Sequence, residues 1–215
     1  MKALLKKEFG LTGATVTYLF VLAAGMAMIP NYPILVVTMI VCIGLIVTFQ
    51  TAREARDTDY YALLPVGKRD IVKAKFLFVA SIEGLTLLLL AVIVVVRTTL
   101  LANAQVYLEN PLMNANAAYL GYAFVCFALF NTFFLVTLFK SGRSFVKPSV
   151  FFFVALFVCV GMFEALHQPF AFPALNSPDI NVAQIMVLAL GALFYLSVTL
   201  VSFRLSAQAY ERADL

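Results

Sequence analysis

The chain has 215 residues, of which 63% are hydrophobic and only 12% charged, and its mean hydropathy is +0.98. This composition excludes a soluble globular domain, which would be far less apolar at this length. The net charge of +4 does not indicate nucleic-acid binding, because the basic residues lie between apolar segments rather than on one face.

Six apolar segments predict an all-α integral membrane protein, since a helix needs roughly 20 mostly apolar residues to cross about 30 Å of hydrocarbon. The predicted spans are 15–29, 34–49, 76–96, 117–139, 149–166 and 182–203, all within one transmembrane domain that covers residues 1–215. The first two are near the lower length limit. They form a tight hairpin, because Pro30-Asn31-Tyr32-Pro33 stops the first helix.

The distribution of basic residues predicts the orientation. Every Lys and Arg except Arg97 lies before the first span, in the second or fourth loop, or in the tail. By the positive-inside rule, both ends of the chain are therefore cytoplasmic. A cleavable signal peptide is the alternative for the first span, but a second span follows after four residues and no convincing cleavage site is present.

Neither metal nor nucleotide chemistry is indicated. The cysteines Cys42, Cys126 and Cys159 lie inside apolar segments without Cys-x-x-Cys spacing, so we expect no metal site. Gly67-Lys68 is the only Gly-Lys pair, and it lacks the upstream glycine and the following Ser or Thr of a phosphate-binding loop. We therefore expect no cofactor on this chain, and any use of ATP must come from a separate protein.

The first ten residues predict a short amphipathic helix in the membrane interface. Leu5 and Phe9 share one helical face, Lys2 and Lys6 share another, and Lys7 adds a further cation. Such a helix places its apolar side in lipid and its lysines near anionic head groups. An ordinary basic leader is the alternative, and the sequence leaves both open.

The loop between the second and third spans combines charges with an apolar patch. Its start, with Arg53, Glu54, Arg56 and Asp57, is compatible with a helix whose charges pair along one surface. The patch 63–66 follows, and Gly67 with Asp70 offers a cap-like start for the next helix. A rigid apolar knob suits the docking of a soluble partner. The alternative is a loop that folds back onto the bilayer surface.

A second unusual segment, 166–175, precedes the last span. It is too apolar for a solvated loop and too interrupted by proline for a span, so a re-entrant or interface-lying hairpin at the outer mouth fits it. The candidate gate residues are His167, Pro169, Phe170, Phe172 and Pro173. An ordinary amphipathic surface loop is the alternative.

Three polar residues at membrane depth, Glu83, Asn131 and Glu164, are candidates for lining a translocation path. Interhelical hydrogen bonding is the alternative for Glu83 and Asn131, and Glu164 could reach water outside. His167 follows Glu164 by three residues on the same helix face. That pair could serve acid–base chemistry, but without a candidate nucleophile nearby an ordinary interfacial histidine is favoured.

Taken in order, these features resemble the small permease subunits of ABC-2 type exporters. The second loop of such permeases often reads Leu-Pro, a short gap, Arg, an acidic residue, two aliphatics and Lys. The matching residues here are Leu64-Pro65, Arg69, Asp70, Ile71-Val72, and Lys73 or Lys75. The similarity in architecture covers essentially the whole chain, whereas this local motif is only moderately specific.

The resemblance implies a transporter of two permeases, identical or related, with two copies of a separate ATPase that binds ATP and Mg²⁺. The loop from 54 to 73 would form a coupling helix on the ATPase, and the segment 167–175 would form a re-entrant gate. The implied coupling residues are Glu54, Asp57, Leu63, Leu64, Pro65, Lys68, Arg69, Asp70 and Lys73. The location would be a bacterial plasma membrane.

Spans rich in Phe and aliphatic residues suit an amphipathic or lipid-like cargo better than a sugar or an ion. The chain is similar in size and layout to Gram-positive exporters of amphipathic peptides, such as phenol-soluble modulins, and to antimicrobial-peptide resistance pumps. Two other classes remain open. One is an ATP-independent secondary transporter or channel, although no inverted repeat is found between 1–100 and 101–215. The other is a membrane scaffold without a transport role.

Overall fold

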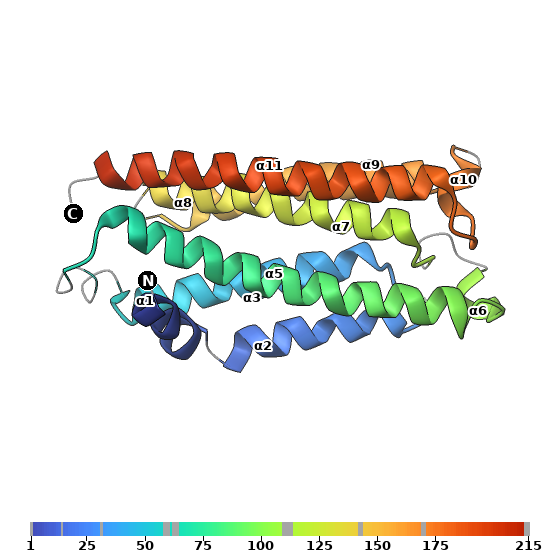
Figure 1. Cartoon of the computed structure of the whole chain (residues 1–215), viewed down its shortest axis with the longest axis horizontal. Coiled ribbons are helices and arrows are strands. Elements are labelled where there is room, and N and C mark those ends of the chain that lie inside the picture. The colour runs from blue at the N-terminus through green and yellow to red at the C-terminus, as the bar shows by residue number, and fades with distance from the viewer. Residues whose placement is uncertain are drawn as a thin grey trace.

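The computed structural model is a bundle of helices that lie side by side, and the described part of the chain contains no strand (Figure 1). It describes residues 2–13, 15–30, 32–57, 61, 65–108, 114–141, 144–168 and 171–212. Helix α1 (Lys2–Lys7) and the last turns of α11 (Val182–Arg212) lie at one end of the bundle, which we call the terminal end. Helices α6 (Gln105–Leu108) and α10 (Pro173–Asn176) lie at the opposite, or far, end (Figure 1).

Within the part of the chain that the structure describes, all regular elements are helices, and five of them are long and apolar enough to cross a membrane, which indicates a membrane protein. They are α3 (Leu35–Glu54), α5 (Lys68–Thr99), the continuous stretch α7–η4–α8 (Ala117–Ser141), α9 (Val146–Leu166) and α11. They coincide with the second to sixth predicted spans. Helix α11 continues well past residue 203, because the polar sequence that follows consists largely of good helix formers.

The first predicted span is a shorter helix in two parts. Helix α2 (Thr15–Leu22) continues as a 3₁₀-helix, η2 (Ala23–Met28). At the usual rises per residue the two parts cover about 24 Å, less than the roughly 30 Å of a hydrocarbon core. The predicted hairpin with α3 is present: the Thr17 and Thr48 hydroxyls are 2.5 Å apart, and a side chain at Gly44 would overlap the Phe20 ring. The count of six spans stays a prediction.

Helices α7 (Ala117–Leu129) and α11 approach each other closely. A Cβ atom added at Gly191 would collide with backbone atoms of Gly121, and one added at Gly121 would collide with the backbone of Val187. Glycine at both positions therefore lets the two backbones touch, which is a common way for helices to associate in membranes. Beside this pair, buried phenylalanines fill the core, with Phe130 stacked on Phe134 at 4.9 Å between ring centroids.

Helices α9 and α11 keep broad apolar surfaces exposed. Large side chains such as Phe157, Val158, Leu190 and Leu193 are more than half exposed. Exposing such an apolar surface to water would be energetically unfavourable, whereas contact with lipid chains is not. The apolar exterior is therefore consistent with a position in the bilayer.

Short helices flank the long ones. Helix α1 is followed by a π-helical turn, η1 (Glu8–Thr12), at the terminal end. At the far end, the Asn116 side chain caps α7 by accepting from the backbone N–H groups of Ala118 and Tyr119, and it donates to the Leu175 carbonyl of α10 at 2.6 Å. The interfacial position of α1 and the re-entrant nature of the α10 segment stay predictions.

Candidate functional site

A buried ion cluster joins three separate segments at the terminal end. Its members are Lys7, Glu8, Asp57, Tyr61 and Lys75. Lys7 Nζ donates to Asp57 Oδ1, and Lys75 Nζ donates to Asp57 Oδ2 at 2.7 Å. The Tyr61 hydroxyl donates to Glu8 Oε1, while Glu8 Oε2 lies 3.6 Å from Lys75 Nζ. The cluster thus connects the N-terminal helices to the loop after α3 and to the start of α5.

Among the described residues, the ion cluster contains two ammonium and two carboxylate groups, and their side chains are at most 12% exposed. Burial by itself would raise the pKa of Asp57, but the charges and hydrogen bonds of Lys75 and Lys7 outweigh it, so this pKa lies below its usual value. Lys7 Nζ also lies 4.0 Å from the Tyr61 ring centroid, a cation–π distance. Removing one partner of such a buried pair leaves an uncompensated charge.

Local backbone features bring the ion cluster together. Helix α3 ends as Arg56 takes a positive φ of 55°, the left-handed conformation that redirects a chain after a helix. Helix α5 begins directly after Gly67, as predicted, with an extended cap residue and Asp70 in its first turn. Leu4 packs with Ile71 in a small apolar cluster that places α1 against α5.

The structure separates the predicted coupling residues into exposed and buried groups. Pro65, Arg69, Asp70 and Lys73 are exposed around the start of α5, and we call these four residues the coupling surface. Lys68 is half-buried, and Glu54 is exposed at the end of α3. Asp57 is not on this surface, and its carboxylate pairs with Lys7 and Lys75 rather than with the arginines beside it. Leu63 and Leu64 lie outside the described residues.

The three predicted interfacial lysines also separate. Lys2 and Lys6 are exposed, as expected of residues near head groups. Lys7 is instead turned into the ion cluster, where its side chain is 9% exposed. The expectation that Lys7 lies near lipid head groups is therefore wrong, because two carboxylates inside the protein compensate its charge more closely than the interface would.

Glu83 and Asn131 meet in the middle of the bundle. Asn131 lies in the π-helical stretch η4 (Phe130–Leu135) and donates to Glu83 Oε2 at 3.0 Å, while the Tyr195 hydroxyl of α11 donates to the same oxygen at 2.7 Å. Asn131 also donates to Thr199. Glu83 is fully buried, so in this conformation the pair connects helices and does not face an open path.

Glu83→Leu is expected to destabilise the protein by about 1–3 kcal/mol, because Tyr195 and Asn131 would lose a buried acceptor. Glu83→Gln keeps an acceptor oxygen and should cost less. Thermal denaturation in detergent would measure both variants, and Ser81→Leu on the exposed side of α5 is the matched control. A Glu83→Leu protein as stable as the control would contradict the role of Glu83 in holding the helices together.

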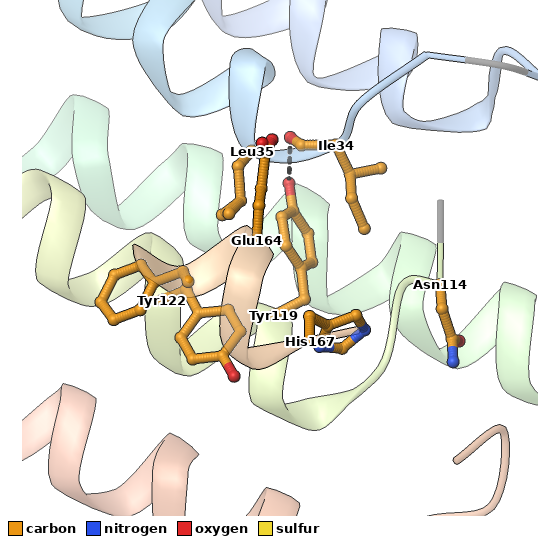
Figure 2. Close-up of a pocket in the computed structure, with 8 residues that line it drawn as sticks. Ile34, Leu35, Asn114, Tyr119, Tyr122, Glu164 and His167 are labelled. Carbon is orange, nitrogen blue, oxygen red and sulfur yellow. Dashed lines mark hydrogen bonds between the residues drawn. The ribbon is translucent and has the colours of Figure 1, made fainter. Parts of the chain in front are cut away.

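At the far end, Glu164 and His167 line one cavity of about 20 Å³, beside Tyr119 and Tyr122 (Figure 2). The predicted shared face of Glu164 and His167 is thus present, and the walls of the cavity come from the starts of α3 and α7. Of the other predicted gate residues, Phe172 and Pro173 are exposed at the start of α10. Pro169 and Phe170 lie outside the described residues.

A match to a known protein family agrees with this geometry. A family model described as "ABC-2 family transporter protein" matches residues 3–211. The chain belongs to this family. Neither the comparison with curated proteins nor the comparison with solved structures found a match. The family identifies the chain as a membrane component of an ABC transporter, a permease of the kind that works with an ATPase.

Several residues of this ABC-2 permease were not singled out from the sequence as parts of a site. The main ones are Glu8, Tyr61, Tyr195, Tyr119 and Tyr122, whereas Lys75 was named only as a possible match to the loop motif. Glu8 carried one usable signal, as an acidic residue within a basic leader that is otherwise free of carboxylates. The tyrosines carried none, because each acts on a segment far away in the sequence. Among the residues that the structure describes, no group of three or more His, Cys, Asp or Glu could hold a metal ion.

Proposed function

We propose that this permease exports amphipathic peptides or other hydrophobic or amphipathic cargo, driven by a separate ATPase. The observation that carries the proposal is the ion cluster beside the coupling surface. Lys75 of α5 pairs directly with Asp57 after α3 and contacts Glu8 of η1. A movement imposed on the coupling surface would therefore be transmitted to the N-terminal helices and to α5 together.

The proposed assembly has two permeases, as identical copies or paralogues, and two ATPase subunits that bind ATP and Mg²⁺. Docking at the coupling surface places the terminal end in the cytoplasm, in agreement with the positive-inside rule. The membrane would be the plasma membrane of a bacterium. Closure of the nucleotide sites would rock the permeases against one another, and cargo would leave outward between them.

The apolar character of the bundle supports an amphipathic cargo. The buried side chains of the described residues are mostly apolar, and Glu83 and Asn131 already bond to neighbouring helices. A role for Glu83, Asn131 or Glu164 in lining the path stays a prediction. It would require these groups to become accessible in another conformation, as occurs when a transporter changes state.

Reversing two charges on the coupling surface is expected to release the ATPase. Arg69 and Lys73 are four residues apart on one exposed face of α5, so Arg69→Glu with Lys73→Glu changes a single patch. Purification of the tagged permease in mild detergent should recover the ATPase with the native chain. The double variant should recover at least about tenfold less ATPase, as expected when the sign of charges in an interface is reversed.

The matched control is Lys140→Glu with Lys147→Glu, two exposed basic residues that undergo the same change of charge at the same end of the bundle. This control should retain the ATPase. An equal loss in both double variants would show that net charge acts rather than the coupling surface. Recovery of no ATPase with the native chain would contradict the ATP-driven mechanism.

One observation favours a second candidate, an ATP-independent transporter that uses intramembrane carboxylates. Glu83 Oε1 and Asn131 Oδ1 are both buried, and neither has a hydrogen-bond partner within the described residues. A proton or ion carried at this position would provide a partner for these two oxygen atoms. Transport by the purified permease alone in vesicles, driven by an ion gradient and abolished by Glu83→Gln, would support this candidate instead.

A further inference from the structure

A hydrogen-bond network in the middle of the bundle joins α5, α11 and the stretch α7–η4–α8, which run side by side (Figure 1). Its members are Glu83 of α5, Asn131 of η4, and Tyr195 and Thr199 of α11. The Tyr195 hydroxyl and Asn131 Nδ2 both donate to Glu83 Oε2, and Asn131 Nδ2 also donates to Thr199 Oγ1. The network therefore uses one of the two carboxyl oxygens and both N–H groups of the amide.

Two oxygen atoms of the network are left without a partner. Glu83 Oε1 and Asn131 Oδ1 are buried, and neither makes a hydrogen bond within the described residues. Glu83 is fully buried and Asn131 is 1% exposed, so neither side chain reaches water in this conformation. When the carboxyl group is ionised both oxygens are acceptors, and two acceptors cannot satisfy one another. Buried polar atoms are normally hydrogen-bonded, so these two oxygens indicate a bound ligand.

The charge of Glu83 leads to the same requirement. An ionised carboxylate in an apolar interior is strongly disfavoured unless a cation pairs with it. The described residues form no salt bridge to Glu83. The titratable groups that interact with it there, Tyr195 of α11 and Cys42 of α3, are uncharged when protonated and supply no cation. The missing ligand is therefore positively charged.

A proton meets both requirements with the two oxygens that are free. On Glu83 Oε1 it neutralises the carboxyl group, and the resulting O–H can donate to Asn131 Oδ1. The acid and the amide would then bond through both of their polar edges, because Asn131 Nδ2 already donates to Glu83 Oε2 at 3.0 Å. Ca²⁺ and Mg²⁺ would instead need about six oxygen ligands, and the described residues contain no acidic, His or Cys group that could hold a metal ion.

We propose that Glu83 and Asn131 form a proton-binding site, in which the proton resides on Glu83 Oε1 and is donated to Asn131 Oδ1. The site goes beyond the proposed ATP-driven export, and it names the ligand that the second candidate function leaves open. Proton binding at this site is sensitive to helix movement, because its hydrogen-bond donors come from η4 and α11 while the carboxyl group is on α5. Separation of α11 from α5 would admit water to Glu83 and allow the proton to leave.

Infrared spectroscopy of the full chain in lipid vesicles tests the proposal, because a protonated carboxyl group has a carbonyl stretching band that an ionised one lacks. At pH 7 exposed Asp and Glu side chains are ionised, so a protonated buried acid can be detected beside them. The native chain is expected to show this band, and Glu83→Gln should remove the contribution of one acid group. Glu211→Gln, which removes an exposed carboxylate at the terminal end, is the matched control and should leave the band unchanged.

Glu83→Gln is expected to fold, because the Gln amide offers an N–H donor in place of the acid O–H and keeps an acceptor for Tyr195. Tyr195→Phe is a second check that leaves the carboxyl group in place. It removes one hydrogen bond from Glu83 Oε2, so the band should move to higher frequency and keep its intensity. No such band in the native chain at pH 7, or a band that neither variant changes, would overturn the proposal and indicate an ionised Glu83. Either result would leave the ATPase co-purification test of the proposed function unaffected.

Discussion

Gly191→Leu is expected to prevent stable packing of α7 against α11 and to cause a severe loss of stability. At this position an added Cβ collides with Gly121 backbone atoms, which cannot rotate away as a flexible side chain would. Helices α7 and α11 must therefore move apart, which disrupts the packing of the core beside them. The cost should exceed the roughly 1–3 kcal/mol typical of overpacking. A fall in melting temperature of at least about 10 °C is then expected for a chain of this length.

The buried cysteines Cys42 and Cys126 provide the measurement, because their thiols become accessible to a thiol-reactive fluorophore only when the bundle opens. A Cys159→Ser background removes the partly exposed thiol. Gly161→Leu is the matched control: it makes the same substitution on α9, where nothing lies within 4 Å of the added Cβ. If Gly191→Leu melts like Gly161→Leu, the close approach of α7 and α11 is wrong.

Asp57→Asn is expected to release the N-terminal helices from the bundle. Among the residues that the structure describes, it leaves the ammonium groups of Lys7 and Lys75 with the Glu8 carboxylate of the ion cluster. Loss of one partner in a buried ion pair typically costs about 3–5 kcal/mol. Part of this cost can be avoided if α1 detaches and Lys7 reaches water. We therefore expect faster amide hydrogen exchange over residues 2–12, measured by mass spectrometry, and weaker coupling of ATP hydrolysis to transport.

The pH dependence provides a second measurement for the ion cluster. The pKa of Asp57 is lower in the folded state than in the unfolded state, where it is about 4. The Asp57 carboxylate therefore contributes fully to stability at pH values above the unfolded-state pKa, and this contribution is lost as the pH falls through the lower folded-state pKa. Protection of residues 2–12 in the native protein should therefore persist from neutral pH to about pH 4 and disappear below it. The Asp57→Asn variant should lack this transition, and Glu211→Gln should retain it. Unchanged protection in Asp57→Asn would contradict the proposed attachment.

The sequence by itself determined the helices that can cross the membrane and several of their ends. A bilayer requires long apolar segments, so five of the predicted spans appear as long helices. Gly67 also marked the start of α5, because an extended cap residue precedes the first helical turn. The shared face of Glu164 and His167 followed from helix periodicity alone. These features depend on composition or on neighbours within one helix.

Only the tertiary structure decided which side chains meet across helices. Lys7 pairs with Asp57, 50 residues away, and Tyr195 bonds to Glu83 across 112 residues. Such contacts depend on the rotation and tilt of each helix, which are set by packing, as where Gly121 and Gly191 let α7 and α11 touch. Helix periodicity identifies which residues share one face of a helix, but it does not identify the neighbouring segment that this face contacts. For this reason the sequence predicted that Lys7 lies near the lipid head groups, while in the folded chain its ammonium group pairs with the carboxylates of Glu8 and Asp57.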